Sequence, residues 1–230
     1  MERLRVVFLV YPNVTQLDLT GPAQVLSRLG AAKVDLVWKT LDPVPTDSGF
    51  SLLPTATLRD VAQADILCVP GGFGCVDVMH DDEALDWVRA VGEQAQWVTS
   101  VCTGSLILGA AGLLKGYRAT SHWAWRDYLA LFGAEPVAER VVFDRNRVTG
   151  GGVTAGIDFA LALTARIRGE RFAQAVQLGL EYDPYPPFES GSPDRAGDEL
   201  TRLVRERSDR MAPDREERVK AAAERLNSTA

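Results

Sequence analysis

Apolar runs alternate along the chain with segments whose apolar positions recur at helical spacing. The first run, RVVFLV at residues 5–10, lacks polar alternation and is typical of a strand covered on both faces. Further strand-like runs lie at 34–40, 66–69 and 97–102, and helical spacing follows at 17–30, 83–94 and 103–114. Asp18 and Thr20 are expected to cap the first of these helices. The alternation predicts an α/β fold with a doubly wound, mostly parallel, flavodoxin-like sheet flanked by helices.

The second half of the chain continues the pattern and then changes character. Residues 118–123 resemble a strand end, 124–133 a helix, 141–152 a hairpin, and 153–167 and 171–182 two helices. A shorter hairpin is expected within 43–55. From about residue 193 the sequence is highly charged and broken by Pro213. We therefore predict one α/β domain at 1–192 and a helical extension at 193–230 that packs on, or exchanges with, a partner subunit.

Ligands of such folds bind at the carboxyl ends of the strands. Three predicted loops open on this edge, and they carry Asp18, the glycine-rich stretch Gly71–Gly74, and Cys102. These segments are therefore the candidates for a functional site.

Composition excludes several classes of protein. The chain has 230 residues, a formal net charge of -6 and no single basic run, which argues against a nucleic-acid partner. The cysteines at 68, 75 and 102 form neither a disulfide framework nor, with two histidines, a zinc pattern. Only about six apolar residues precede Pro12, too few for a signal sequence or a membrane span. A cytoplasmic protein is expected.

Cys102 lies where the strand WVTSVC turns sharply into the helix TGSLILGAAGLL. A nucleophile elbow has this strand-turn-helix order and exposes its nucleophile above the sheet. A helix amino terminus favours negative charge, so we expect a lowered thiol pKa and a thiolate near neutral pH. The alternative is a buried structural cysteine, which is the interpretation we give to Cys68.

These motifs resemble the ThiJ/PfpI family of the class I glutamine amidotransferase-like superfamily. The resemblance runs from Arg5 to about Tyr185 and is carried by LDLTGP (17–22), VPGGFG (69–74), SVCTG (100–104), GLLKGYRATSHW (112–123) and TGGGVTAGIDFAL (149–161). Asp18, the CTG sequence and EYDPYPPF (181–188) are most similar to the isonitrile hydratases, or cyclohexyl-isocyanide hydratases, within that family.

The resemblance implies a hydro-lyase in which Cys102 is the nucleophile, Asp18 the general acid/base and Thr103 an assisting residue. Cys102 would form a covalent thioimidate with the isonitrile carbon while Asp18 supplies that carbon with a proton. Asp18 would then activate water, which releases an N-substituted formamide. No redox change occurs, so no cofactor is expected, and the expected partners are a small isonitrile and a second subunit in a homodimer. Asp18 also has a purely structural alternative as a helix N-cap.

Three further residues are candidates for binding the substrate. The amides of Gly72 and Thr103 could stabilise developing negative charge, although glycine pairs are also common in turns. His122, at the end of the predicted strand 118–123, could pair with Cys102 or simply pack beside Trp123 and Trp125. We expect no metal site.

The sequence argues against some related activities and leaves others open. An amidotransferase would need a late histidine, and none follows His122. A peptidase of this family typically has histidine directly after the cysteine, where Thr103 stands here. A carbonyl-stress hydrolase or glyoxalase-like enzyme is an alternative, as is a non-catalytic ligand-sensing domain like those of AraC-type regulators, which share the CTG and TSHW motifs.

Overall fold

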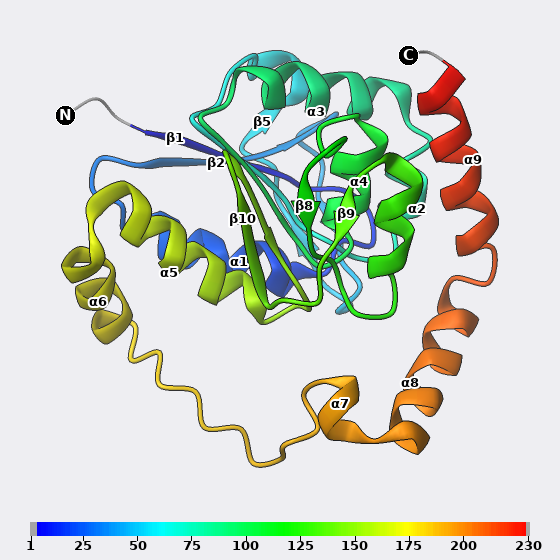
Figure 1. Ribbon diagram of the computed structural model, residues 1–230. Helices are drawn as coiled ribbons and strands as arrows, with labels where there is room; N and C mark the ends of the chain where they lie inside the picture. The colour runs from blue at the N-terminus through cyan, green and yellow to red at the C-terminus, as the bar shows by residue number, and fades with distance from the viewer. Residues whose placement is uncertain (1–3, 229–230) are drawn as a thin grey trace.

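The computed structural model describes residues 4–228 as a sheet with helices on both faces and a long tail (Figure 1). The central sheet has the strand order β10-β11-β7-β6-β1-β2-β5, and every neighbouring pair is parallel except β10 and β11. Its strands are β1 (Arg5–Leu9), β2 (Lys33–Trp38), β5 (Ala56–Thr57), β6 (Ile66–Val69), β7 (Trp97–Val101), β10 (Val141–Asp144) and β11 (Arg147–Gly150). The mostly parallel, doubly wound fold predicted from the alternation is confirmed.

Two small sheets accompany the central one. The hairpin expected within 43–55 forms from β3 (Val44–Pro45) and β4 (Ser51–Leu52), and β8 (Arg118–Ala119) pairs with β9 (Glu135–Pro136). The strand expected at 118–123 therefore ends early and outside the central sheet. The reason is that the Thr120 amide donates to the Thr149 side chain, at 2.8 Å, instead of to a strand backbone.

Helices cover both faces of the sheet. One face carries α1 (Gln16–Leu26) and α5 (Ala155–Arg168), which pack on each other, with α6 (Glu170–Gly179) beside them. The other face carries α3 (Asp82–Gln94) and α4 (Gly104–Ala110), with α2 (Cys75–Val78) and the 3₁₀ segment η2 (Arg126–Phe132) against α4. A second 3₁₀ turn, η1, spans Leu58–Asp60. None of the helices within residues 4–228 combines the length and apolar composition needed to cross a bilayer.

Two local predictions are wrong. Helix α1 begins at Gln16 after the N-cap Thr15, so Asp18 and Thr20 lie inside the helix rather than at its cap. The helix expected at 124–133 is a 3₁₀ helix, in which hydrogen bonds join residues three apart, as between Tyr128 and Trp125.

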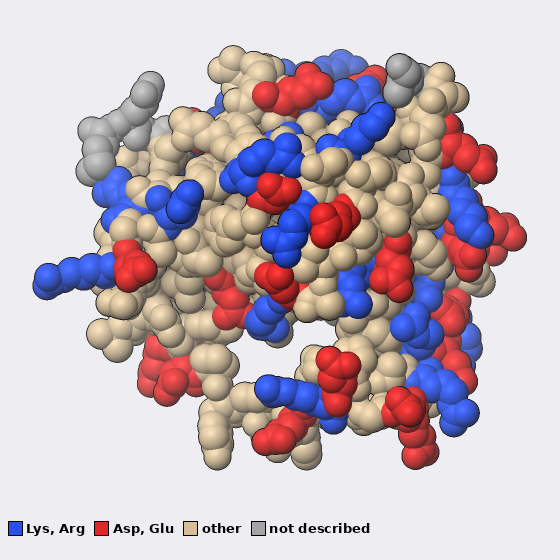
Figure 2. Space-filling model, in the orientation of Figure 1, with Lys and Arg blue, Asp and Glu red and all other residues tan. Residues whose placement is uncertain are grey.

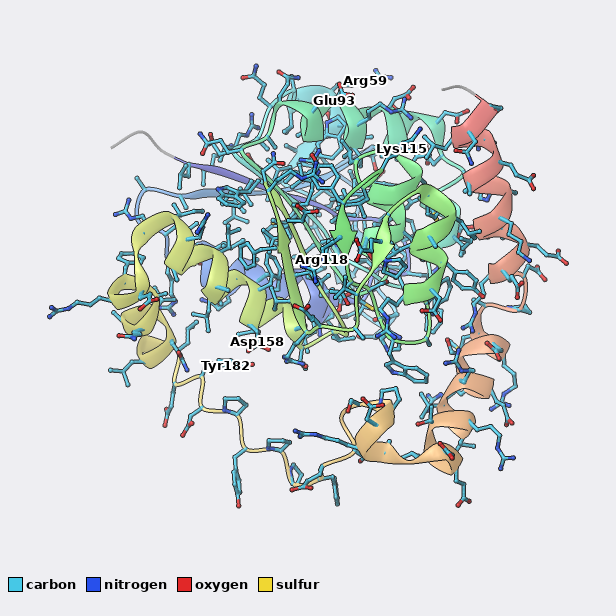
Figure 3. All side chains as sticks on the ribbon, viewed as in Figure 1. Arg59, Glu93, Lys115, Arg118, Asp158 and Tyr182 are labelled. Atoms are coloured by element: carbon cyan, nitrogen blue, oxygen red, sulfur yellow. The ribbon has the colours of Figure 1, made fainter. Side chains whose placement is uncertain are left out.

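The tail leaves the body after α6 and returns to it at its far end. Tyr182 donates to Asp158 of α5 where the arm departs, and both are labelled in Figure 3. The arm leads through α7 (Pro193–Ala196) and α8 (Asp198–Met211) to α9 (Arg215–Ser228). Figure 2 shows an opening between this arm and the body. Helix α9 buries Val219 and its neighbours Ala222 and Ala223 against the body, so the tail is anchored at both ends.

Candidate active site

Cys102 occupies a strained corner between β7 and α4. Its φ angle is 54°, in the left-handed region that non-glycine residues rarely adopt. The conformation is fixed from both sides, because the Cys102 amide donates to the carbonyls of Gly150 and Gly151, and its carbonyl accepts from Ser105 and Ser121. The corner has the form of a nucleophile elbow.

Asp18 reaches the same corner from the first turn of α1. Its side chain is fully buried, and Oδ2 accepts a 2.9 Å hydrogen bond from the Gly71 amide. Oδ1 has no hydrogen-bond partner among residues 4–228. A methyl group at Gly71 would lie 2.7 Å from Oδ2 and 2.8 Å from the Cys102 Cβ, which is too close for either contact, so both side chains pack against the bare Gly71 Cα. The structure thus brings Asp18 and Cys102 together.

Burial dominates the protonation of this pair. It raises the pKa of Asp18 to about 7, although the Gly71 amide and the neighbouring Cys102 thiol act in the opposite direction. Burial, together with the Asp18 charge, also raises the pKa of Cys102 well above the usual value of 9.0. The amide of Thr103 faces the sulfur and lowers that pKa, but by less. The lowered thiol pKa expected from the helix end is therefore wrong, because α4 is short and desolvation outweighs it.

Thr103 and Gly72 are bound to each other. The Gly72 amide donates to Thr103 Oγ1 at 3.0 Å, and the same hydroxyl lies 3.1 Å from the Gly72 carbonyl. Gly72 has a φ of 139°, and a side chain there would lie 2.4 Å from the Asn13 carbonyl, so glycine is required. The Gly72 amide is occupied in this arrangement, whereas the Thr103 amide points at the sulfur.

His122 also lies at the site, on a loop rather than at a strand end. Its Nδ1 accepts from the Ala124 amide at 3.3 Å, which places the proton of the neutral ring on Nε2. Burial, with the nearby Arg215 charge, lowers the pKa of His122 to about 4. The ring packs on Trp123 at a centroid distance of 5.5 Å. His122 is thus an uncharged hydrogen-bond donor near neutral pH.

A pocket of about 220 Å³ opens above the cysteine. Its lining comes from six loops and one tail helix: Thr15, Asp47, Gly72, Phe73, Cys102, Thr103, His122, Trp125, Val153 and Ser208. Asp18 is not in the lining, because it lies behind Cys102 and Gly71. A small, mostly apolar molecule can reach the sulfur from the pocket while the carboxyl group stays out of solvent.

Sequence reasoning placed Gly71 in a candidate segment without a role, and it did not connect Thr15, Asp47, Val153 or Ser208 with the site. Gly71 lies in the VPGGFG motif, and its amide and its lack of a side chain make room for the pair. Trp125 was noted only as a neighbour of His122. Ser208 comes from the charged tail, where no periodicity or motif connects it to a pocket more than 100 residues away in sequence. Only the tertiary structure places it there.

Comparisons with known proteins agree with this geometry. An isonitrile hydratase of Pseudomonas putida is 52% identical over 224 residues, which cover 97% of this chain and 98% of that protein. A ThiJ/PfpI family protein from Pseudomonas syringae has a crystal structure with a TM-score of 0.89 and 45% identity, over 97% of this chain and 91% of that one. The regulator GbdR of Pseudomonas aeruginosa is 29% identical over 185 residues, 76% of this chain but only 50% of the regulator. The model of the DJ-1/PfpI family matches residues 4–166, and so the chain, with its cysteine elbow and glycine-rich loop, belongs to the DJ-1/PfpI family.

Proposed function

We propose that the protein is an isonitrile hydratase, a hydro-lyase that adds water to an isonitrile and releases an N-substituted formamide. The 52% identity to the Pseudomonas putida enzyme, at nearly equal length, carries this conclusion. The site has the chemistry that the reaction needs. A thiol that can bond to carbon lies beside a carboxyl group that can hold and return a proton.

In the first half of the reaction the Cys102 sulfur attacks the terminal isonitrile carbon. Because burial raises the thiol pKa, the resting sulfur is protonated, and the adjacent Asp18 carboxylate accepts its proton as the S–C bond forms. As the S–C bond forms, one C–N π pair moves to the nitrogen, and Asp18 then gives its proton to the lone pair on the same carbon. The product is a thioimidate, R–N=CH–S–Cys102, and Asp18 is again a carboxylate.

In the second half water enters through the pocket. The Asp18 carboxylate takes a proton from water as the oxygen attacks the thioimidate carbon, and then gives that proton to the nitrogen. As the C–S bond breaks, the remaining hydroxyl proton passes to the leaving sulfur. Formamide leaves and Cys102 recovers its proton, so one water is consumed and no electrons are exchanged. A carboxyl pKa of about 7 suits this alternation, since acid and base forms are both accessible near neutral pH.

The lining residues would stabilise these intermediates. The Thr103 amide faces the sulfur and can stabilise the charge that develops as its proton leaves. The Gly72 amide donates to the Thr103 hydroxyl, which fixes the glycine-rich loop. Gly72 can therefore donate to the substrate only after this hydrogen bond breaks. His122 Nε2–H is assigned to binding the substrate nitrogen, as an uncharged donor.

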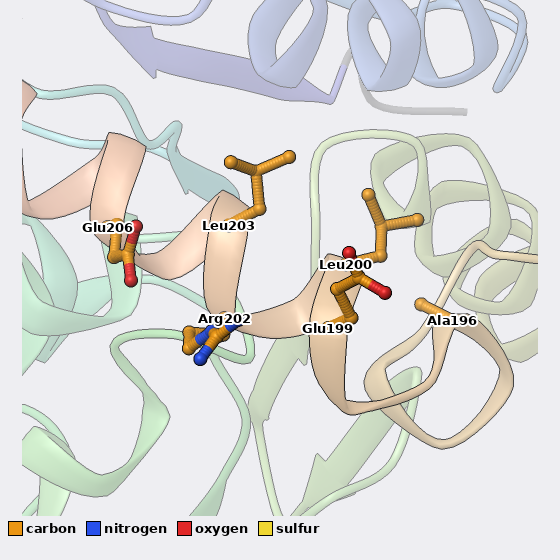
Figure 4. A pocket seen from close by; sticks show the side chains of 6 residues that line it. All are labelled: Ala196, Glu199, Leu200, Arg202, Leu203 and Glu206. Atoms are coloured by element: carbon orange, nitrogen blue, oxygen red, sulfur yellow. The ribbon is translucent and has the colours of Figure 1, made fainter.

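We further propose that the enzyme works as a homodimer in the cytoplasm. Unpaired cysteines suit a reducing compartment. Large apolar side chains on the tail are exposed, among them Tyr185 and Phe188 on the arm. Figure 4 shows Leu200 and Leu203 projecting from the same side of α8, in a groove of about 320 Å³. Light scattering should give twice the chain mass, and Leu203→Glu should lower it; a monomeric parent would refute the dimer.

The decisive experiment follows the formamide. Purified protein with cyclohexyl isocyanide should yield N-cyclohexylformamide, and both Cys102→Ala and Asp18→Asn should abolish turnover. Asp42→Asn is the matched control, because Asp42 is an exposed carboxylate outside this pocket that accepts a hydrogen bond from the Thr40 hydroxyl. Stoichiometric protection of Cys102 from alkylation without formamide would instead indicate a ligand-sensing domain.

A further inference from the structure

The tail of the chain forms part of the wall of the Cys102 pocket. Ser208 of α8 lines the pocket together with Trp125 and His122, although these residues come from opposite ends of the second half of the chain. Two arginines of the same segment lie over the tryptophans that flank His122. Arg205 is 5.1 Å from the Trp123 ring centre, and Arg215 is 4.9 Å from that of Trp125.

Arg215 connects all of these contacts. Its side chain is only 8% exposed, which is rare for arginine. One guanidinium nitrogen donates to Ser208 Oγ at 2.8 Å, another lies 2.5 Å from an Asp209 carboxylate oxygen, and the plane covers Trp125. A planar guanidinium makes such directed contacts in several directions at once. Arg215 thereby fixes the last turn of α8 relative to Trp125, a residue of the body.

The rest of α8 contacts the body at Trp123, where Arg205 lies over the ring and Leu200, Thr201 and Val204 line a small cavity beside it. The helix has no buried residue, and it follows an arm that is exposed over much of its length. Helix α9, by contrast, is anchored on the body by buried apolar side chains and by the Arg218–Asp77 ion pair. Of these contacts, the Arg215 hydrogen bond acts directly on Ser208, and so we assign the position of Ser208 over the pocket to Arg215, where the two helices meet.

We propose that residues 205–215 form a roof over the Cys102 pocket that selects the substrate by the size of its N-substituent, with Ser208 as the specificity-determining residue and Arg215 as the residue that positions it. The reacting carbon of an isonitrile is terminal and the same in every substrate. Discrimination between substrates must therefore come from the part of the pocket wall that contacts the N-substituent. Cys102 and Ser208 line the same pocket, the first from the sheet edge and the second from the tail.

The roof is tested with two pairs of probes that differ only in bulk. This inference rests on the proposed function for the class of substrate, so one pair of probes is methyl and cyclohexyl isocyanide. The other pair is N-methylmaleimide and N-cyclohexylmaleimide, whose reaction with Cys102 requires no isonitrile turnover. Cys68 and Cys75 do not compete, because both are buried away from this pocket, whereas Cys102 lines it. Peptide mapping assigns the alkylated residue.

Ser208→Leu should narrow the pocket. We expect the ratio of cyclohexyl to methyl reactivity to fall about tenfold or more in both probe pairs, since one methylene in an apolar pocket already changes discrimination by about 10- to 200-fold. Arg207→Leu, at an exposed position of the same helix, is the control and should leave both ratios unchanged. If Ser208→Leu changed the reactivity of large and small probes equally, or changed neither, the proposed role of the roof would be refuted.

Arg215 is tested by rescue. Arg215→Met should raise KM for cyclohexyl isocyanide while kcat for methyl isocyanide stays within about threefold, and Arg215→Lys should restore part of the selectivity. A purely structural role would lower both kcat values together and refute positioning. The two hypotheses fail separately. A parent that turns over no isonitrile but shows the expected maleimide selectivity refutes the proposed function alone, and an active Ser208→Leu variant with unaltered ratios refutes the roof alone.

Discussion

The space around Gly71 gives the sharpest prediction for the catalytic pair. An added Cβ at this position would lie 2.6 Å from the Thr103 nitrogen, 2.7 Å from Asp18 Oδ2 and 2.8 Å from Cys102 Cβ. These contacts are roughly 1 Å shorter than the favourable separation of about 3.5–4.0 Å. None can be relieved cheaply, because the Cys102 backbone is held by the β11 loop and Oδ2 is held by the Gly71 amide.

Gly71→Ala should therefore displace the Asp18 carboxyl group and Cys102 from each other by about 1 Å. A displacement of about 1 Å at a reacting centre costs on the order of 100-fold in rate, so we expect at least that loss in kcat/KM. Overpacking should cost about 1–3 kcal/mol of folding free energy, or a Tm lower by roughly 2–12 °C. The protein should remain folded.

The assay compares formamide formation and calorimetric Tm for the parent and two variants. Gly179→Ala is the control, because a Cβ at Gly179 meets nothing within 4 Å and its backbone needs no positive φ. The control should keep its activity. A Gly71→Ala protein with kcat/KM within twofold of the parent would refute the claim that packing against the bare Gly71 Cα sets the distance between Asp18 and Cys102.

The remaining predictions concern protonation. Because Asp18 must be ionised to accept the thiol proton, kcat/KM should rise as pH increases through about 7 and stay high beyond 9.0. An enzyme with a low-pKa thiolate would instead be active well below pH 7. Burial raises the folded-state pKa of Asp18 from 3.8 to about 7, so its contribution to stability is fully present below about pH 4 and is lost as pH rises toward 7. The loss is on the order of 4 kcal/mol. The free energy of unfolding of Asp18→Asn, measured in urea, should lack this decline. The lowered pKa of His122 makes stability rise with pH over part of the same range, so the quantity to measure is the difference between the variant and the parent. His122→Gln should keep kcat/KM within about tenfold at pH 7.5, since a ring with a pKa of about 4 is not the base; loss of turnover to the level of Cys102→Ala would assign that role to His122.

Much of the fold follows from local sequence. Buried parallel strands are apolar along their whole length and helices repeat every 3.6 residues, so the alternation at 5–10, 17–30, 66–69 and 97–114 predicts the sheet and its layers. The position of Cys102 at a strand-to-helix corner follows in the same way, because a corner is a local property of the chain. Where local signals were weak they gave the wrong result: the helix cap assigned to Asp18 and the strand at 118–123 both depend on partners distant in sequence.

The sequence by itself therefore determined the fold class, the elbow and the segments that meet at the sheet edge. Tertiary structure alone decided the chemistry of the pair, since the pKa values of Asp18 and Cys102 depend on how completely the surrounding chain excludes water. It also decided that Arg215 and Ser208 reach the pocket. Desolvation and contacts between remote segments are properties of the packed molecule, and no pattern along the chain encodes them in a form that can be read before the chain is folded.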